Sequence, residues 1–229
     1  LVRRAAYAAQ YLELFGFLGL PVELAVYEPA AGASDSVAVA VEAYSHGGGR
    51  YATVNLNRPL RDELRRKAAH LRLRLDIVED HAQRVGAHFA AASFDAACFH
   101  HAINDILQTA ASEPRGMDTT VVDWWPNERQ MIEWLAEDYA ADGLAARGRP
   151  ELLAAVAGAV ELVRPGGYLL FDHWTSLAAR ERAWFPWDLF CDLIPLARGW
   201  IAASGLPLEE VLLPGADPRW WMCQRVHAG

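Results

Sequence analysis

Two clusters of histidine with amide and acidic residues carry the most reactive chemistry in this sequence. The first spans residues 100–105, His-His-Ala-Ile-Asn-Asp, and the second is the pair Asp172-His173. Histidine titrates close to neutral pH, so it can take a proton from a hydroxyl group, and a carboxylate beside it can orient its ring. We predict His101 as the general base and His173 as the second choice, with Asp105 or Asp172 orienting whichever acts. Each histidine taken singly could equally be a packing or capping residue.

Adjacent histidines also raise the question of a metal site. No third ligand follows them at a spacing that zinc sites use. The three cysteines, Cys98, Cys191 and Cys223, are far apart and form no C-x-x-C motif. We therefore expect no bound metal, no disulfide framework and a reduced, cytoplasmic environment.

Aromatic side chains form a second group of candidates. The chain holds 9 tryptophans in 229 residues. Aromatic rings attract a cationic ligand by on the order of 1 kcal/mol each and stack on flat ligands, although a single tryptophan is more often a core residue. Segments near the histidine clusters hold three of the tryptophans, and the first helix holds two tyrosines that could close over a ligand. We predict that substrate is bound by Tyr7, Tyr11, Asn104, Trp124, Trp125 and Trp174.

Alternating patterns of strand and helix position these residues. The sequence predicts an α/β fold in which a parallel sheet is covered on both faces, and its last two strands form a hairpin. Ligands of such sheets lie at the carboxyl ends of the strands, where residues 100–105 are expected. Strands are predicted at 23–27, 51–56, 73–78, 94–99, 168–172, 208–213 and 220–227, and helices at 2–18, 35–44, 59–71, 82–89, from 102, and at 128–141, 150–162 and 188–204.

One domain covering residues 1–229 is the expected organisation, because a chain of this length buries one substantial core. Residues 112–128 interrupt the strand and helix alternation with two prolines, a glycine and a tryptophan pair. We expect this insertion and the N-terminal helix, residues 1–20, to form a substrate cap.

Composition and charge exclude several classes of function. The formal net charge is −8, and the basic residues between 58 and 74 fit a solvated helix face, so a nucleic-acid partner is not expected. No run of about 18 apolar residues exists to cross a membrane. The charged residues Arg3, Arg4 and Glu13 near the start do not suit a signal peptide.

Two segments carry a resemblance to a known family. Residues 93–97, Ser-Phe-Asp-Ala-Ala, and residues 162–168, Leu-Val-Arg-Pro-Gly-Gly-Tyr, resemble the fourth strand and the turn before the fifth strand of class I S-adenosylmethionine-dependent methyltransferases. The resemblance covers nearly the whole chain. It implies a doubly wound, seven-stranded, mostly parallel α/β sheet with a C-terminal antiparallel hairpin and an N-terminal helical cap.

The resemblance also implies a cofactor, S-adenosyl-L-methionine, and the residues that bind it. The turn after the first strand, residues 28–34, keeps one glycine of the family's three. An asparagine replaces the usual ribose-binding acid after the second strand, and residues 79–82 resemble the adenine-binding segment. The residues implied are Glu28, Ala30, Gly32, Asn55, Leu56, Asp80, His81, Phe99 and His100, with no metal ligand among them.

The function implied is methyl transfer to an oxygen or nitrogen atom of a small molecule, in secondary metabolism. A protein that binds S-adenosylmethionine without turnover is the main alternative, because two of the family's three glycines are absent. A different reaction on the same fold also stays open. A nicotinamide oxidoreductase is disfavoured because the G-x-G-x-x-G turn is missing. The expected partner is the small-molecule methyl acceptor, and pairing into a homodimer is left open.

Overall fold

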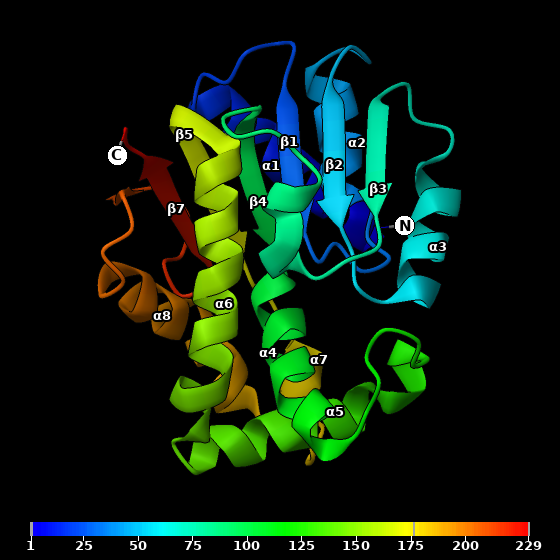
Figure 1. The fold of residues 1–229 in the computed structure, drawn as a ribbon, viewed down its shortest axis with the longest axis vertical. Helices are drawn as coiled ribbons and strands as arrows, with labels where there is room; N and C mark the ends of the chain where they lie inside the picture. The colour runs from blue at the N-terminus through cyan, green and yellow to red at the C-terminus, as the bar shows by residue number, and fades with distance from the viewer. Residues whose placement is uncertain (1, 176, 229) are drawn as a thin grey trace.

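A seven-stranded sheet forms the centre of the protein (Figure 1). The computed structural model describes residues 2–175 and 177–228. The strand order is β3-β2-β1-β4-β5-β7-β6. Strands β1 to β5 pair in parallel, whereas β7 is antiparallel to both β5 and β6, which confirms the predicted doubly wound sheet and closing hairpin. The strands are β1 (Ala25–Pro29), β2 (Arg50–Val54), β3 (Arg74–Val78), β4 (Phe94–His100), β5 (Val163–Asp172), β6 (Leu208–Val211) and β7 (Trp221–Val226).

Helices cover both faces of this sheet. Helices α1, α2 and α3 bury their apolar sides on one face, and η1, α4, α6 and α8 cover the other. Figure 1 shows α6 in front of the sheet, with α4 and α5 below the strand tips. The helices are α1 (Val2–Phe17), α2 (Ser36–Tyr44), α3 (Arg58–Ala68), η1 (Ala82–Ala87), α4 (Ala102–Ser112), η2 (Glu113–Arg115), α5 (Trp124–Ala140), α6 (Gly143–Leu162), α7 (Leu177–Arg180) and α8 (Trp187–Ala202). None of the described helices is long and apolar enough to span a lipid bilayer.

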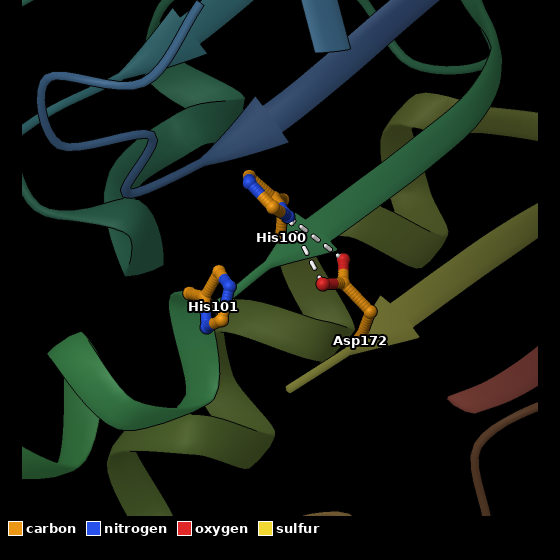
Figure 2. Close-up of side chains that lie close together, drawn as sticks. All are labelled: His100, His101 and Asp172. Carbon is orange, nitrogen blue, oxygen red and sulfur yellow. Dashed lines mark hydrogen bonds and ion pairs between the residues drawn. The ribbon is translucent and has the colours of Figure 1, made fainter. Parts of the chain in front are cut away.

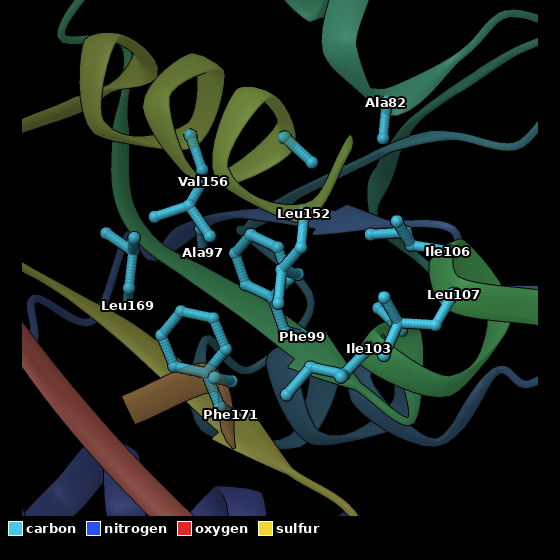
Figure 3. Close-up of a cluster of buried hydrophobic side chains, with 14 of the residues drawn as sticks. Ala82, Ala97, Phe99, Ile103, Ile106, Leu107, Leu152, Val156, Leu169 and Phe171 are labelled. Carbon is cyan, nitrogen blue, oxygen red and sulfur yellow. The ribbon is translucent and has the colours of Figure 1, made fainter. Parts of the chain in front are cut away.

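Strand residues alternate between the two cores. Phe99 and Phe171 point toward α4 and α6, where their rings stack with centroids 4.4 Å apart (Figure 3). Cys98 and Leu170, their neighbours in the chain, belong to the core on the opposite face. Because both faces are covered, strand residues are apolar at successive positions, as is usual for parallel sheets.

The turn before β5 shows why the Pro-Gly-Gly segment is structural. A Cβ atom on Gly167 would lie 2.4 Å from the carbonyl oxygen of Asp95, so only glycine fits there. The pairing of β4 with β5 changes register between Phe94 and Ala96 beside this turn. Because Val163 already pairs with Phe94, β5 starts earlier than the predicted residue 168.

Two helices begin earlier than the sequence predicts. Helix α5 starts at Trp124 rather than 128, because Pro126 lies in its first turn, where the missing N–H breaks no helical hydrogen bond. Helix α6 starts at Gly143, and Pro150, expected to begin it, lies inside. The tryptophan pair therefore stands on a helix rather than on a loop.

The remainder of the predicted insertion is tied to α3. Asn57 caps that helix, since its Oδ1 accepts a hydrogen bond from the Leu60 backbone N–H at 3.0 Å. Its Nδ2 donates to the carbonyl oxygens of Thr119 and Val122 at 2.9 and 2.8 Å. One buried side chain thus fixes the loop beside the carboxyl edge of the sheet.

Candidate functional site

Three adjoining cavities lie at the carboxyl edge of the sheet. The strand-edge cavity, about 360 Å³, lies over the ends of β1, β2 and β3. The central cavity, about 660 Å³, lies between α1, the turn after β1 and α4, and shares Gly32 and Asp105 with the first. The histidine cavity, about 290 Å³, reaches His173 and shares Tyr7 and His101 with the central one. The three cavities therefore join into one elongated site.

The turn after β1 has a left-handed backbone at two residues. Ala30 has φ +50° and Gly32 has φ +56°. The Ala30 N–H donates to the Val54 carbonyl at 3.0 Å, and Asn55 Nδ2 donates to the Gly32 carbonyl at 2.6 Å. Because its nitrogen is used in this way, Asn55 offers its Oδ1 as an acceptor at the strand-edge cavity. All four residues line that cavity.

Gly32 and Asp105 face each other where the first two cavities meet. A Cβ atom on Gly32 would lie 3.6 Å from Asp105 Oδ2. Burial raises the pKa of Asp105 to about 7, with a further contribution from the negative charge of Glu128. Asp105 therefore sits near its titration point at neutral pH, and a bound cation would favour its ionised form.

The segment after β3 contributes one of its two predicted residues to the cavity wall. His81 lines the strand-edge cavity with Leu56. Asp80 does not line it, because its Oδ1 accepts from the His81 N–H and its Oδ2 contacts His88 Nε2, each at 2.8 Å. The acid thus holds the turn, and the histidine beside it faces the cavity.

Two further predicted cofactor residues lie behind the cavities. Phe99 belongs to the core under α6. Glu28 is fully buried; its Oε2 accepts a hydrogen bond from the Tyr51 hydroxyl at 2.6 Å, and its Oε1 has no partner among the described residues. Burial raises the pKa of Glu28 to about 8, so its neutral form predominates at pH 7. Neither residue lines one of the three cavities.

His100 and Asp172 form a buried pair at the ends of β4 and β5 (Figure 2). His100 Nδ1 lies 3.0 Å from both carboxylate oxygens of Asp172, and the Tyr11 hydroxyl donates to Asp172 Oδ1. Burial alone would lower the pKa of His100, but the adjacent carboxylate outweighs it and raises that pKa. The same pairing outweighs burial in Asp172 and lowers its pKa. The two groups therefore form an ion pair.

His101 lies between His100 and His173. It caps α4 with a left-handed backbone, φ +56°, and its Nε2 lies 3.0 Å from the Tyr7 hydroxyl. Its ring centroid lies 4.6 Å from that of His100 and 5.2 Å from that of His173. Burial, reinforced by the charge of His101, holds the pKa of His173 well below its ordinary value. A left-handed non-glycine residue costs about 1–3 kcal/mol and is common at functional sites.

His100, His101 and Asp172 are also arranged so that they could hold a metal ion. One ligand atom of each lies within 4.8 Å of the other two. No sequence spacing marks the third ligand, because Asp172 lies on β5, the strand paired with β4. The Asp172 oxygens already accept hydrogen bonds from Tyr11 and His100, so a metal would have to displace these contacts.

One face of α1 lies against the site. Arg4 pairs with both carboxylate oxygens of Asp35 at 2.6 Å. Tyr7 contacts His101, and Tyr11 bonds to Asp172. Side chains at this spacing share one helix face, so α1 reaches the turn after β1, β4 and β5 together. The predicted closing role of both tyrosines stays a prediction, and the part played by Arg4 was missed.

The predicted tryptophans lie at different depths. Trp124 is buried between the strand-edge and central cavities. Trp125 is 58% exposed beside the central cavity, and Trp174 is 44% exposed at the histidine cavity. Asn104 lines both of these cavities. Sequence reasoning missed eight further residues of the histidine cavity, which no motif marks: Glu128, Ile132, Thr175, Ala179, Arg182, Trp184, Phe185 and Phe190.

No protein-family model and no curated protein matches this sequence. Solved structures match its fold. A provisionally named S-adenosyl-L-methionine-dependent methyltransferase from Methanococcus maripaludis has a TM-score of 0.58 and 10% identity, over 97% of this chain and 86% of that one. A provisionally named rRNA-methylase from Clostridium thermocellum has a TM-score of 0.55 and 11% identity, over 95% of each chain. Cofactor-bound Rv0187 from MTB has a TM-score of 0.55 and 12% identity, over 96% of this chain and 81% of that one. The chain thus has the class I methyltransferase fold.

Proposed function

We propose that the protein transfers a methyl group from S-adenosylmethionine to an oxygen or nitrogen atom of a small molecule. The observation that carries the proposal is the joined strand-edge and central cavities, where the left-handed turn at Gly32 meets Asn55 and Asp105. This is the crevice between β1 and β4, where the strand order reverses and doubly wound sheets bind their ligands. The shared fold and the net charge of −8, which disfavours nucleic acid, support the same conclusion.

The residues present fit such a cofactor. Asn55 Oδ1 is an acceptor for a ribose hydroxyl, and Leu56 and His81 form a wall for the adenine ring. Asp105 and Glu128 bring two carboxyl groups to the central cavity, which suits a ligand with a positive sulfur. When bound, S-adenosylmethionine supplies an electrophilic methyl group on that sulfur.

The side chains of the protein position the methyl acceptor and take up its proton. His101 lies at the boundary between the central and histidine cavities, and its Nε2 is a proton acceptor in the tautomer that carries the ring proton on Nδ1. Tyr7 fixes its ring, and the His100–Asp172 ion pair packs beside it. Alignment of the acceptor and exclusion of water are the main contributions expected of a methyltransferase, and a general base adds roughly 10²- to 10⁴-fold for a hydroxyl acceptor.

Cofactor binding is tested with two matched glycine variants. Gly32→Ala and Gly205→Ala each put a side chain on a left-handed residue, at φ +56° and +74°, and neither new Cβ lies within 3.4 Å of another atom. Both should lose about 1–2 kcal/mol of stability through backbone strain. Gly32→Ala alone should weaken S-adenosylmethionine binding, by about tenfold or more in calorimetric titration, because its methyl group enters the cavity. Equal binding by both variants, or no binding by the wild type, contradicts the proposed site.

Turnover is tested by the release of S-adenosylhomocysteine with a panel of small alcohols and amines. His101→Gln should retain cofactor affinity and lose roughly 10²-fold or more in rate with a hydroxyl acceptor. A wild-type protein that binds the cofactor but consumes none with any acceptor is instead a binding protein on the same fold.

A further inference from the structure

The histidine cavity contains buried polar atoms that no described residue satisfies. His173 is 2% exposed, and both its Nδ1 and its Nε2 lack a hydrogen-bond partner within the described part of the chain. Asn104 is 8% exposed, and its Oδ1 is likewise unpartnered there. Leaving such groups unpaired is unfavourable, so a ligand that pairs with them gains affinity.

These atoms specify the polar groups of that ligand. Asn104 Nδ2 donates one of its two N–H groups to Asp105 Oδ1 at 3.1 Å, whereas Asn104 Oδ1 has no partner among the described residues, so the unsatisfied group is an acceptor. A hydroxyl or N–H donor on the ligand satisfies it. Because burial keeps the pKa of His173 well below its ordinary value, the neutral ring offers one donor and one acceptor. A hydroxyl group satisfies either nitrogen.

The charges around the cavity disfavour an ionised ligand. A carboxylate or phosphate placed at Asn104 has no proton to donate, so it would leave the Asn104 Oδ1 unpaired. Glu128 lines this cavity as well as the central one, so an anionic ligand would face a carboxyl group, and Arg182, which could offset it, is exposed to solvent. A permanent cation would find no buried ionised carboxylate beside His173, since Asp172 is already paired with His100.

Aromatic side chains line another part of the histidine cavity. The centroid of the Phe190 ring lies 5.3 Å from that of His173 and 4.4 Å from that of Phe185. The Trp184 ring lies 5.8 Å from that of Phe185. Such rings bind flat apolar surfaces. A cavity of about 290 Å³ lies at the lower limit for small-molecule pockets, so it suits one or two fused rings.

We infer that the methyl acceptor is an uncharged phenol of one or two rings, with its reacting hydroxyl between His101 and His173 and a neighbouring hydroxyl that donates to Asn104 Oδ1. This inference rests on the proposed function and names its substrate class. In the reaction the phenol oxygen forms a bond to the methyl carbon of the sulfonium donor while the carbon–sulfur bond breaks. The electron pair stays on sulfur, and the hydroxyl proton passes to His101 Nε2.

The test measures binding separately from turnover. Fluorescence titration, with S-adenosylhomocysteine present, compares 2,3-dihydroxynaphthalene with 2,3-dimethoxynaphthalene, which has the same rings but no donor. The wild type should prefer the dihydroxy compound about tenfold or more, which corresponds to about 1.4 kcal/mol. It should bind a naphthoate and a naphthylmethylammonium more weakly than the dihydroxy compound.

His173→Phe keeps a ring of similar shape and removes both unpartnered nitrogens. It should melt at the same temperature as the wild type or higher, yet lose most of the preference for the dihydroxy compound. His227→Phe is the control, because His227 contacts the exposed Glu209 and lines none of the three cavities. This control should retain the preference.

The outcomes separate this inference from the proposed function. A preserved preference in His173→Phe, or tighter binding of either charged compound, overturns the inference. Methyl transfer to other acceptors while phenols fail to bind leaves the function standing and refutes the substrate class. Binding of the dihydroxy compound with the expected preference, but no transfer to any acceptor, supports the binding site and refutes the methyltransferase.

Discussion

Three fully buried tyrosines, substituted one at a time by phenylalanine, test how hydrogen bonding is distributed around the site. Tyr11 donates its hydroxyl to ionised Asp172, and Tyr51 donates to the largely neutral Glu28. The hydroxyl of Tyr27 has no partner among the residues described. Each substitution removes one oxygen atom and keeps the ring, so the three losses can be compared directly.

The three substitutions should reduce the free energy of unfolding by different amounts. A hydrogen bond to a charged group contributes about 1.5–3 kcal/mol and a neutral one about 1 kcal/mol. Tyr11→Phe should therefore lower the free energy of unfolding most, Tyr51→Phe less, and Tyr27→Phe should be neutral or slightly stabilising. For a chain of 229 residues, Tm falls by about 2–4 °C per kcal/mol, so Tyr11→Phe should melt roughly 3–12 °C below the wild type.

Urea denaturation supplies the free energies, and unchanged m-values show that the unfolded state is comparable between variants. Tyr27→Phe is the control for loss of a buried hydroxyl as such. If it destabilises the protein as much as Tyr11→Phe does, the hydrogen-bond assignment at Asp172 is wrong. A smaller loss in Tyr11→Phe than in Tyr51→Phe would refute the ionised state of Asp172.

Three further predictions concern pH, metal and the loop before α5. Burial raises the pKa of Glu28 from 4.5 to about 8, so the folded chain holds a proton that the unfolded chain has released, and stability falls as pH rises across that window. Glu28→Gln should reduce this fall by up to about 3 kcal/mol, at about 1.4 kcal/mol per pKa unit, in melts at pH 5 and pH 8. Treatment with EDTA should leave Tm and methyl transfer unchanged, because Asp172 is already hydrogen-bonded to Tyr11 and His100; a loss restored by Zn²⁺ would show a metal at that cluster. Asn57→Ala should cost about 2–4 kcal/mol from one helix cap and two hydrogen bonds, and should expose residues 116–123 to proteolysis, whereas wild-type resistance there would contradict the anchoring role.

Local sequence signals were sufficient for the fold. Apolar runs bounded by turns marked every strand within a few residues, except that β5 was expected to start at 168. Gly167 shows why that turn could be recognised, since its close approach to Asp95 excludes any side chain. The start of α5 was misplaced because proline usually marks a loop, whereas Pro126 occupies a helical first turn.

The site was less accessible to sequence reasoning, because its contacts join distant segments. His100 and Asp172 are 72 residues apart, and only the pairing of β4 with β5 brings them together. Burial of Glu28 and the neutral state of His173 depend on which helices cover them, which no spacing reveals. The roles assigned to these residues in binding or catalysis stay predictions.

The polar face of α1 contacts three separate parts of the candidate site. Arg4 contacts Asp35, Tyr7 contacts His101, and Tyr11 contacts Asp172. Because the first residue of each pair lies on the same helix, an outward movement of α1 would break all three contacts together. Loss of these contacts would change the surroundings of His101 and Asp172, and with them their acid–base properties. Slower amide hydrogen exchange along α1 would therefore report ligand binding in the site even before any product is formed.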